Sequence, residues 1–489
     1  MSRVTSALPN FSHADIMRVL SGAMLCVLLA ALDQTVVIPA LPAIANDLGA
    51  YKQLSWIVAA YLITSTISTP VYGKLSDIYG RRRLLLTCIA LFIVTSVLCG
   101  LARSLDQLIW CRALQGLGGG GLMALTQAAI ADVMSPRERG RYQGYISAVW
   151  ALSSVGGPLV GGFMAESLSW RWIFWLNLPV GAVAMWACNN GLRRLPLPKL
   201  RGKPRLDIIG ALLLGSALSV LLLAIGWGGN TYPWASWEII GLMALGVVLL
   251  LLLVGQEMCA ADPLLPPRVF ASSSYNASIV ISTSTSMLMF MCLFSIPLYF
   301  QLARGTTATQ SGLYLAPFML ASAAGNIVGS RWGRRLGGMR AELRVASALC
   351  CAGLVLLACL PPDTPKWAFI VAMLIAGPGV GGCLIGSMMG TQNALPAGDI
   401  GSGTSALLVL RSVGGAAGSS LAGAILATGL ASVQHGAGTL QAVPTTMHGL
   451  HFGAVYGVAA GCAALSFVVA MCMPDKRLRE SLHVSPVSE

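Results

Sequence analysis

The sequence carries little charge. Only 10% of its 489 residues are Asp, Glu, Lys or Arg, whereas a soluble domain averages about 25%. It has no G-x-x-x-x-G-K-[ST] pattern, which binds nucleotide phosphates, and no soluble segment that reads as a nucleotide-binding domain. A soluble protein and an ATP-driven pump are therefore both disfavoured.

Residues typical of enzymatic or metal sites are also scarce. The five histidines lie at the chain ends or in a single loop, with no group of carboxylates beside them: His13, His435, His448, His451 and His483. The 13 cysteines fall mostly inside apolar runs and include no C-x-x-C pair, which favours packing over disulfides or metal ligation. We therefore expect no enzyme, no metal and no cofactor.

Long apolar runs dominate the chain. Hydrophobic residues make up 56% of it, and several runs reach the roughly 20 residues that cross a bilayer. We expect fourteen spans, an even number that places both termini on one side. They cover residues 18–40, 54–74, 84–102, 106–131, 142–165, 171–191, 207–227, 236–256, 275–301, 308–331, 344–361, 367–391, 402–428 and 451–473. The N-terminus has no small-residue cleavage site, so the first span is expected to act as an uncleaved insertion signal.

The distribution of Lys and Arg predicts the orientation. Of the 31 basic residues, twenty-four fall at the termini and in the loops on the same side, five fall in the opposite loops, and two lie inside spans. By the positive-inside rule, the termini and the basic loops are cytoplasmic. The net charge of +13 is therefore a topology signal, and we expect no nucleic-acid partner.

The spans divide into two groups of six with two between them. The expected parts are a six-helix bundle at 1–192, a basic loop with two extra helices at 193–262, a second six-helix bundle at 263–475 and a cytoplasmic tail at 476–489. The two middle spans are rich in leucine and lack buried charge, so they should face lipid. The loops GKLSDIYGRRR (73–83) and GSRWGRRLGGMR (329–340) stand at matching places in the two halves, as duplicated transporter halves would show.

One acidic and one basic residue lie inside spans of the first half. Asp33 follows about 15 residues of the first span, which places it about 22 Å into a core of about 30 Å. Arg112 shares a helical face with Gln115, Gly116 and Gly119. Because an intramembrane carboxylate must face water, pair or take up a proton, we expect Asp33 to carry a proton with Arg112 as its partner. A fixed ion pair and a purely structural arginine remain the alternatives.

The first basic loop has the pattern of a latch. Asp77 lies near Arg81 and Arg82, and Gly73 and Gly80 permit a tight turn and close approach. An Asp–Arg pair at a helix end could hold the cytoplasmic side shut and release when the halves move apart. The alternative is ordinary positive-inside charge. The second loop has no acidic residue at the place of Asp77, and beyond Asp33 we expect no acidic residue deep in a span.

The stretch 150–181 combines apolar character with helix breakers. Its glycines and proline are Gly156, Gly157, Pro158, Gly161 and Gly162. In a membrane such residues let helices approach closely, and neighbouring groups satisfy the backbone that the proline frees. The span carries no ionisable group before Glu166, so we expect a hinge and a seal between the two bundles.

A substrate cavity is expected between the bundles. Its candidate residues are Gln34, Trp56, Tyr61, Gln115, Trp150, Tyr299, Asn326 and Arg411. Aromatic and polarizable linings suit bulky amphipathic or cationic ligands. The alternative for the Trp and Tyr residues is anchoring at the membrane interface, and for Arg411 a structural or gating role.

These motifs together resemble the major facilitator superfamily, specifically its fourteen-span drug:proton antiporters. The matching stretches are LDQTVVIPALPAIANDLG (32–49), GKLSDIYGRRR (73–83), RALQGLGGGG (112–121), GGPLVGG (156–162), WRWIFWLNLPVG (170–181), PLYFQLARGTTATQSGLYLAPF (297–318) and RSVGGAAGSS (411–420). The resemblance implies an all-helical fold of two six-helix bundles plus two extra helices, with Asp33 at the titrating position.

The resemblance also implies a function. It predicts a proton-coupled antiporter in a bacterial cytoplasmic membrane that exports hydrophobic or cationic drugs by alternating access. Its partners would be a small-molecule substrate, protons and the bilayer, and a periplasmic adaptor with an outer-membrane channel is left open. The alternatives are an exporter of one dedicated metabolite or self-made antibiotic, and a non-transporting membrane sensor or scaffold.

Overall fold

The computed structural model is helical throughout its described part, which comprises residues 13–49, 54–133, 136–194, 207–228, 232–260, 263, 267–336, 338–361, 364–395, 400–434 and 445–474. The helices are α1 (His13–Leu48), α2 (Leu54–Tyr79), α3 (Arg81–Gly100), α4 (Leu105–Val133), α5 (Pro136–Ser167), α6 (Arg171–Trp175), α7 (Asn177–Gly191), η2 (Leu192–Arg194), α8 (Ile208–Trp227), α9 (Trp237–Cys259), η3 (Pro267–Ala271), α10 (Ser273–Leu298), η4 (Tyr299–Ala303), α11 (Ala308–Leu336), α12 (Arg340–Cys359), α13 (Lys366–Ala394), α14 (Ile400–Gln434) and α15 (Thr445–Cys472).

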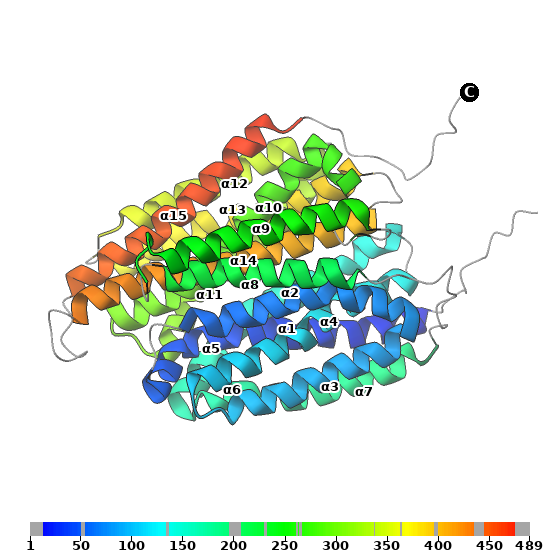
Figure 1. Cartoon of the computed structure of the whole chain (residues 1–489), viewed down its shortest axis with the longest axis horizontal. Coiled ribbons are helices and arrows are strands. Elements are labelled where there is room, and N and C mark those ends of the chain that lie inside the picture. Colours follow the sequence, from blue (N-terminus) through cyan, green and yellow to red (C-terminus); the bar gives the residue numbers. More distant parts are fainter. Residues whose placement is uncertain are drawn as a thin grey trace, which may run out of the picture.

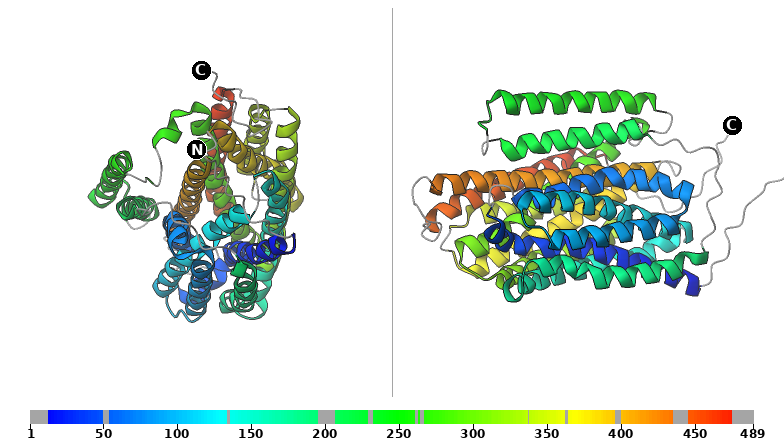
Figure 2. Two further views of the ribbon diagram at one scale, coloured as in Figure 1. Left: turned by 90° about the vertical axis from the view of Figure 1, so that its right-hand side faces the viewer. Right: turned by 60° about the horizontal axis from the view of Figure 1, so that its bottom comes forward.

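The long helices form two bundles that lie side by side (Figure 1). Helices α1 to α5 and α7, with the short α6, make the first bundle, and α10 to α15 make the second. Helices α8 and α9 pack against each other and stand outside both bundles, with α8 touching α2 and α14 (Figure 2). This arrangement confirms the expected fold class of two six-helix bundles with two extra helices.

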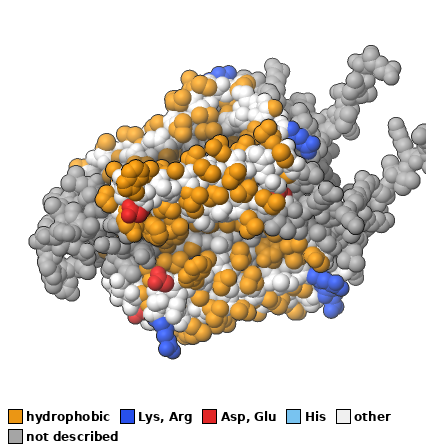
Figure 3. Space-filling model, in the orientation of Figure 1, with side chains coloured by type: hydrophobic (Ala, Val, Ile, Leu, Met, Phe, Trp, Pro, Cys, Tyr) orange, Lys and Arg blue, Asp and Glu red, His pale blue; other side chains and the backbone are white. Residues whose placement is uncertain are grey.

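The surface of the bundles is apolar along the helices. Hydrophobic side chains cover the face in Figure 3, and charged ones lie towards the two ends of the helices. Within the described residues, nine helices are long and apolar enough to cross a bilayer. Only 17% of the most apolar stretch of α9 is buried, against 72% for α1. Because α9 buries so little, most of its leucines lie at the surface, as expected for a peripheral span. Helix α8, by contrast, buries Leu214, Leu218 and Leu222.

Glycines set the close packing of the first bundle. A side chain at Gly116 would meet the Tyr61 carbonyl of α2, and one at Gly120 would meet the Ser65 carbonyl. On another face of α4, Gly118 lies against the backbone of α3 at Phe92. The glycine run of α4 therefore lets three helices approach closely, and it forms no phosphate-binding loop.

Several element boundaries differ from the expected spans. The sixth span is split at Leu176 into α6 and α7, and the ninth ends in the π-helical turn η4. Helix α12 begins at Arg340, four residues before the expected start at residue 344. This last difference matters because it brings Glu342 into a helix, where only 2% of it is exposed. Glu342 is therefore buried near a span end, and the expectation that no acidic residue other than Asp33 lies deep in a span is not contradicted.

Candidate functional site

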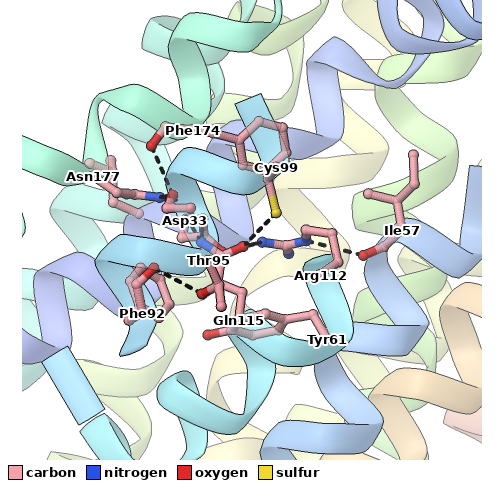
Figure 4. A network of polar contacts seen from close by, with 12 residues as sticks. Asp33, Ile57, Tyr61, Phe92, Thr95, Cys99, Arg112, Gln115, Phe174 and Asn177 are labelled. Atoms are coloured by element: carbon pink, nitrogen blue, oxygen red, sulfur yellow. Dashed lines mark hydrogen bonds and ion pairs between the residues drawn. The ribbon is translucent and has the colours of Figure 1, made fainter. Parts of the chain in front are cut away.

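A buried ion pair joins α1 to α4. The Oδ2 atom of Asp33 lies 2.5 Å from Nη1 of Arg112, and the two side chains are 0% and 1% exposed (Figure 4). The structure thus brings together the two residues that the sequence singled out. Charges removed from water are stable only when further hydrogen bonds satisfy their remaining polar atoms, so the residues around the pair decide what it can do.

Two amide side chains satisfy the second carboxylate oxygen. Nε2 of Gln115 donates to Oδ1 of Asp33 at 3.0 Å, and Nδ2 of Asn177 donates to the same oxygen at 2.8 Å. Both amides also donate to the Ser96 hydroxyl, at 3.1 and 2.8 Å, and Ser96 donates to the Phe174 carbonyl at 2.8 Å. Each oxygen of Asp33 therefore has a donor, and the site suits an ionised carboxylate.

The arginine has acceptors other than Asp33. Nη1 of Arg112 donates to Oε1 of Gln115 at 2.7 Å, and Nε donates to the Ile57 carbonyl at 3.2 Å. The Tyr61 ring lies against the guanidinium, with 4.4 Å between the ring centroid and Cζ. A guanidinium stays charged under all conditions. The bonds of Arg112 to Gln115 and to the Ile57 carbonyl do not involve Asp33.

Several helices of the first bundle position this network. Arg112 and Gln115 are three residues apart on α4 and so lie on one helical face. Asn177 is the first residue of α7, directly after the break that follows α6. Ser96 comes from α3 and Asp33 from the middle of α1. Among the described residues, the hydrogen-bond partners of this network all come from the first bundle.

Helix α5 packs on both bundles through its glycines. A side chain at Gly157 would meet Thr35 of α1, and one at Gly161 would meet the Val36 backbone. A side chain at Gly162 would meet the Ala308 backbone of α11 in the second bundle. Gly156 faces open space. These contacts form a seam between α1, α5 and α11, and they explain the glycine pattern sterically. The role of this seam as a hinge and a seal stays a prediction.

Two further contacts strengthen the α1–α5–α11 seam. The Thr35 hydroxyl donates to the Ser153 carbonyl of α5 at 2.9 Å. In the second bundle, Gly312 of α11 lies against the Pro158 carbonyl, where a side chain would clash. The proline-containing turn of α5 therefore lies directly against the facing helix of the other bundle.

Polar contacts also join the bundles where α5 ends and α11 begins. The Thr309 hydroxyl of α11 donates to Oε2 of Glu166 at 2.6 Å, and the Thr309 backbone N–H donates to the same oxygen at 3.3 Å. Nearby, Nε2 of Gln301 donates to the Pro39 carbonyl of α1 at 3.0 Å. A carboxylate at a helix N-terminus is favourable, so Glu166 caps α11 from the opposite bundle.

The basic loop makes its turn at Gly80. The φ angle of Gly80 is 86°, in the left-handed region that favours glycine, and α3 begins at the next residue. Arg81 donates through Nη1 to the Ser76 hydroxyl and to the Gly73 carbonyl, the latter at 3.4 Å. These bonds fold the arginine back onto the last turns of α2.

The expected latch partner of these arginines is only partly described. The side chain of Asp77 lies outside the described residues, so the Asp–Arg latch stays a prediction. Arg82 donates through Nη2 to Oδ1 of Asn189 on α7 at 2.6 Å. That bond joins two helices of the same bundle.

The expected cavity residues separate into groups. Tyr61 and Gln115 belong to the buried network. Tyr299 is 2% exposed and stacks on Phe369, with 4.8 Å between the ring centroids, where Arg304 donates to its hydroxyl at 2.9 Å. The other candidates are partly buried on α1, α2, α5, α11 and α14: Gln34, Trp56, Trp150, Asn326 and Arg411. A role in substrate binding stays a prediction for all of them.

Sequence reasoning missed Ser96, Asn177 and Glu342. Asn177 carried a usable signal, because an amide inside the aromatic run WRWIFWLNLPVG has to find hydrogen-bond partners in the apolar interior. Ser96 carried none, since serine occurs on every face of these helices. Glu342 was hidden by the late start assigned to its span.

The fold and the buried polar network define the class of protein. The chain is a multi-pass membrane protein with two helical bundles and a buried ion pair in the first bundle. Residues 23–419 match the family described as Major Facilitator Superfamily. The chain belongs to the major facilitator superfamily.

Relatives support this assignment along most of the chain. An uncharacterized MFS-type transporter of Mycobacterium tuberculosis is 35% identical over 429 residues, which are 86% of this chain and 61% of that protein. The chain thus spans less than two thirds of that relative's length. The multidrug transporter protein MdtP of Bacillus subtilis is 32% identical, with 83% of this chain and 74% of that protein covered.

Solved structures show the same fold. A bacterial homolog of the human lysosomal transporter Spinster, solved in an inward-facing conformation, superimposes with a TM-score of 0.64. The match covers 95% of this chain and 98% of that chain, at 15% sequence identity. At this identity the likeness concerns the fold alone.

Proposed function

We propose that the protein is a proton-coupled antiporter of the fourteen-span drug-exporting group, which moves hydrophobic or cationic compounds out of the cytoplasm. The observation that carries the proposal is the Asp33–Arg112 pair, buried in the first bundle and held by partners from several helices. The name of the Bacillus subtilis relative, a multidrug transporter, supports the substrate class.

The geometry offers a physical basis for proton coupling. Asp33 is satisfied as an anion by one guanidinium and two amides. A proton on Oδ2 would break the contact with Arg112 and leave the contacts with Gln115 and Asn177 available. Arg112 would keep its bonds to Gln115 and to the Ile57 carbonyl. Loading and release of a proton at Asp33 would thus rearrange one contact between α1 and α4.

That rearrangement lies next to the seam between the bundles. Thr35, two residues after Asp33, bonds to α5 and lies against Gly157, and α5 in turn lies against α11. A change in how α1 sits would therefore reach the second bundle through α5. Alternating access requires this kind of link between a charged site and a rigid-body movement.

Transport into everted membrane vesicles tests the proposal, because their cytoplasmic face points outward. Vesicles energised with an interior-acid proton gradient should take up the lipophilic cation ethidium, or another dye of a panel of cationic and neutral compounds, and Asp33→Asn should abolish this transport. Asp47→Asn is the matched control, because Asp47 lies on the same helix but is paired with Arg171 at the α1 end, where its side chain is 46% exposed.

The control should keep most of its activity, since exposed ion pairs contribute only about 0–1 kcal/mol. Full gradient-driven efflux by Asp33→Asn would disprove the coupling role of Asp33. The absence of transport for every compound of the panel in the wild-type vesicles would disprove the drug-exporter assignment.

A further inference from the structure

The second bundle contains a buried carboxyl group for which the described residues offer no partner. Glu342 lies in the first turn of α12, and 2% of the residue is exposed. Neither carboxyl oxygen has a hydrogen-bond partner among the residues that the structure describes. Asp33 in the first bundle, by contrast, has a donor for each oxygen. The two bundles thus hold buried carboxyl groups in opposite environments.

The carboxyl group fits against the glycine backbones of two neighbouring helices. A Cβ added at Gly329 of α11 or at Gly382 of α13 would lie 2.6 Å or 2.9 Å from Oε1 of Glu342. A Cβ at Gly386 of α13 would clash with Oε2. Any larger residue at these three positions would have to displace the carboxyl group. The sequence therefore keeps open a space of the size that this carboxyl group fills.

The charged groups nearby point elsewhere. Arg340 donates to the Met471 carbonyl at 3.0 Å, and Arg344 donates to the same carbonyl at 2.9 Å. Arg331 of α11 is exposed, and the side chains of residues 334–337 lie outside the described part. On α13, the titratable neighbour is the buried thiol of Cys383. No described cation faces Glu342.

An ionised carboxylate in such a place is costly. Moving an unpaired charge out of water requires many kcal/mol, and in practice the group becomes neutral instead. A neutral carboxyl group in the membrane region marks a candidate proton site. The position is also meaningful, because Gly329 and Gly333 of α11 belong to the stretch 329–340 that matches 73–83 of the first half, where Asp77 occupies the place of Gly333.

We propose that Glu342 is a second proton-carrying site of the transport cycle, protonated in the present conformation and deprotonated in the conformation in which water reaches the start of α12. The step breaks the O–H bond of the carboxyl group and passes the proton to water at the end of the bundle where α12 begins. This inference rests on the proposed proton coupling, and it assigns one coupled proton to each bundle.

Infrared spectroscopy and transport together test the assignment. Purified wild-type protein should show the C=O stretching band of a protonated carboxyl group, and Glu342→Gln, which keeps the shape but cannot ionise, should lack it. In proteoliposomes with an imposed pH gradient and the membrane potential clamped at zero, Glu342→Gln should accumulate about tenfold less ethidium per pH unit than the wild type, because one coupled proton is lost.

The controls separate this proposal from the preceding one. Glu257→Gln, at a 5% exposed glutamate of the peripheral helix α9, should accumulate ethidium like the wild type. Absence of the Glu342-dependent band, or wild-type accumulation by Glu342→Gln, would overturn the second proton site even if Asp33→Asn abolishes coupling. If Asp33→Asn couples normally while Glu342→Gln behaves as stated, the assignment of Asp33 fails and that of Glu342 stands.

Discussion

At the scale of single residues, hydrogen bonds from three side chains hold the Asp33 carboxylate. Its carboxylate receives hydrogen bonds from Arg112, Gln115 and Asn177, and the last of these reaches it from the start of α7. A hydrogen bond to a charged group is worth about 1.5–3 kcal/mol. The amides therefore contribute to the stability of the ion pair on the same scale as the pairing itself.

Asn177→Ala should slow gradient-driven efflux by about tenfold or more, because it removes a donor worth about 1.5–3 kcal/mol from the ionised carboxylate. The measurement is the initial rate of gradient-driven uptake into everted vesicles. Thr95→Val serves as the control, since buried Thr95 bonds only to carbonyls of its own helix, at 2.7 Å and 3.1 Å. Equal rates for the two variants would contradict a role of Asn177 in the network.

At the scale of single elements, helix α5 packs against helices of both bundles. Its glycines form two faces, with Gly157 and Gly161 against α1, and Gly162 against α11. In a membrane, helices associate by close packing of small residues and not by the hydrophobic effect. The pattern of glycines thus indicates which helices α5 packs against.

Two neighbouring glycines of α5 offer a matched pair. Gly157→Ala should destabilise the protein by about 1–3 kcal/mol and reduce transport, because the added methyl group meets Thr35. Gly156→Ala faces open space and should leave both properties near the wild-type level. Thermal unfolding and dye efflux measure the two effects. A Gly157→Ala variant with unchanged stability and transport would exclude the tight α1–α5 seam.

At the same scale, the sequence carried much of the architecture but less of the site. The order of the long helices in two bundles follows from runs of apolar residues of sufficient length, and the shared face of Arg112 and Gln115 follows from their spacing. Asn177 and Ser96 could not be placed, because these helices are apolar on most faces and periodicity does not fix their rotation. Glu342 depended on where α12 begins, and an error of four residues placed it in a loop.

At the scale of the whole molecule, hydrogen bonds and glycine contacts join the two bundles. Glu166 and Gln301 join α5 to α11 and η4 to α1, next to the glycine contacts of α5. The bundles are therefore tied together at the end where α5 stops and α11 starts. We expect these contacts to break when this end opens during transport.

A disulfide between cysteines introduced at Glu166 and Thr309 should stop transport, and a reducing agent should restore it. The two side chains hydrogen-bond across the bundles at 2.6 Å, so a covalent link there would prevent the bundles from separating. The experiment needs a background in which the 13 native cysteines are replaced. A pair at Asp47 and Trp170, which bond at 3.0 Å within one bundle, should allow transport. Full activity of the oxidised Glu166/Thr309 pair would contradict the rigid-body account.

We expect substrate movement and proton movement to be linked through Asp33. Proteoliposomes loaded with a pH-sensitive dye measure this directly, with a substrate gradient and no imposed proton gradient. For the wild type we predict proton flux opposite to the substrate, and for Asp33→Asn substrate exchange without that flux. Substrate movement in the wild type without any proton flux, or an unchanged proton flux in Asp33→Asn, would contradict the account.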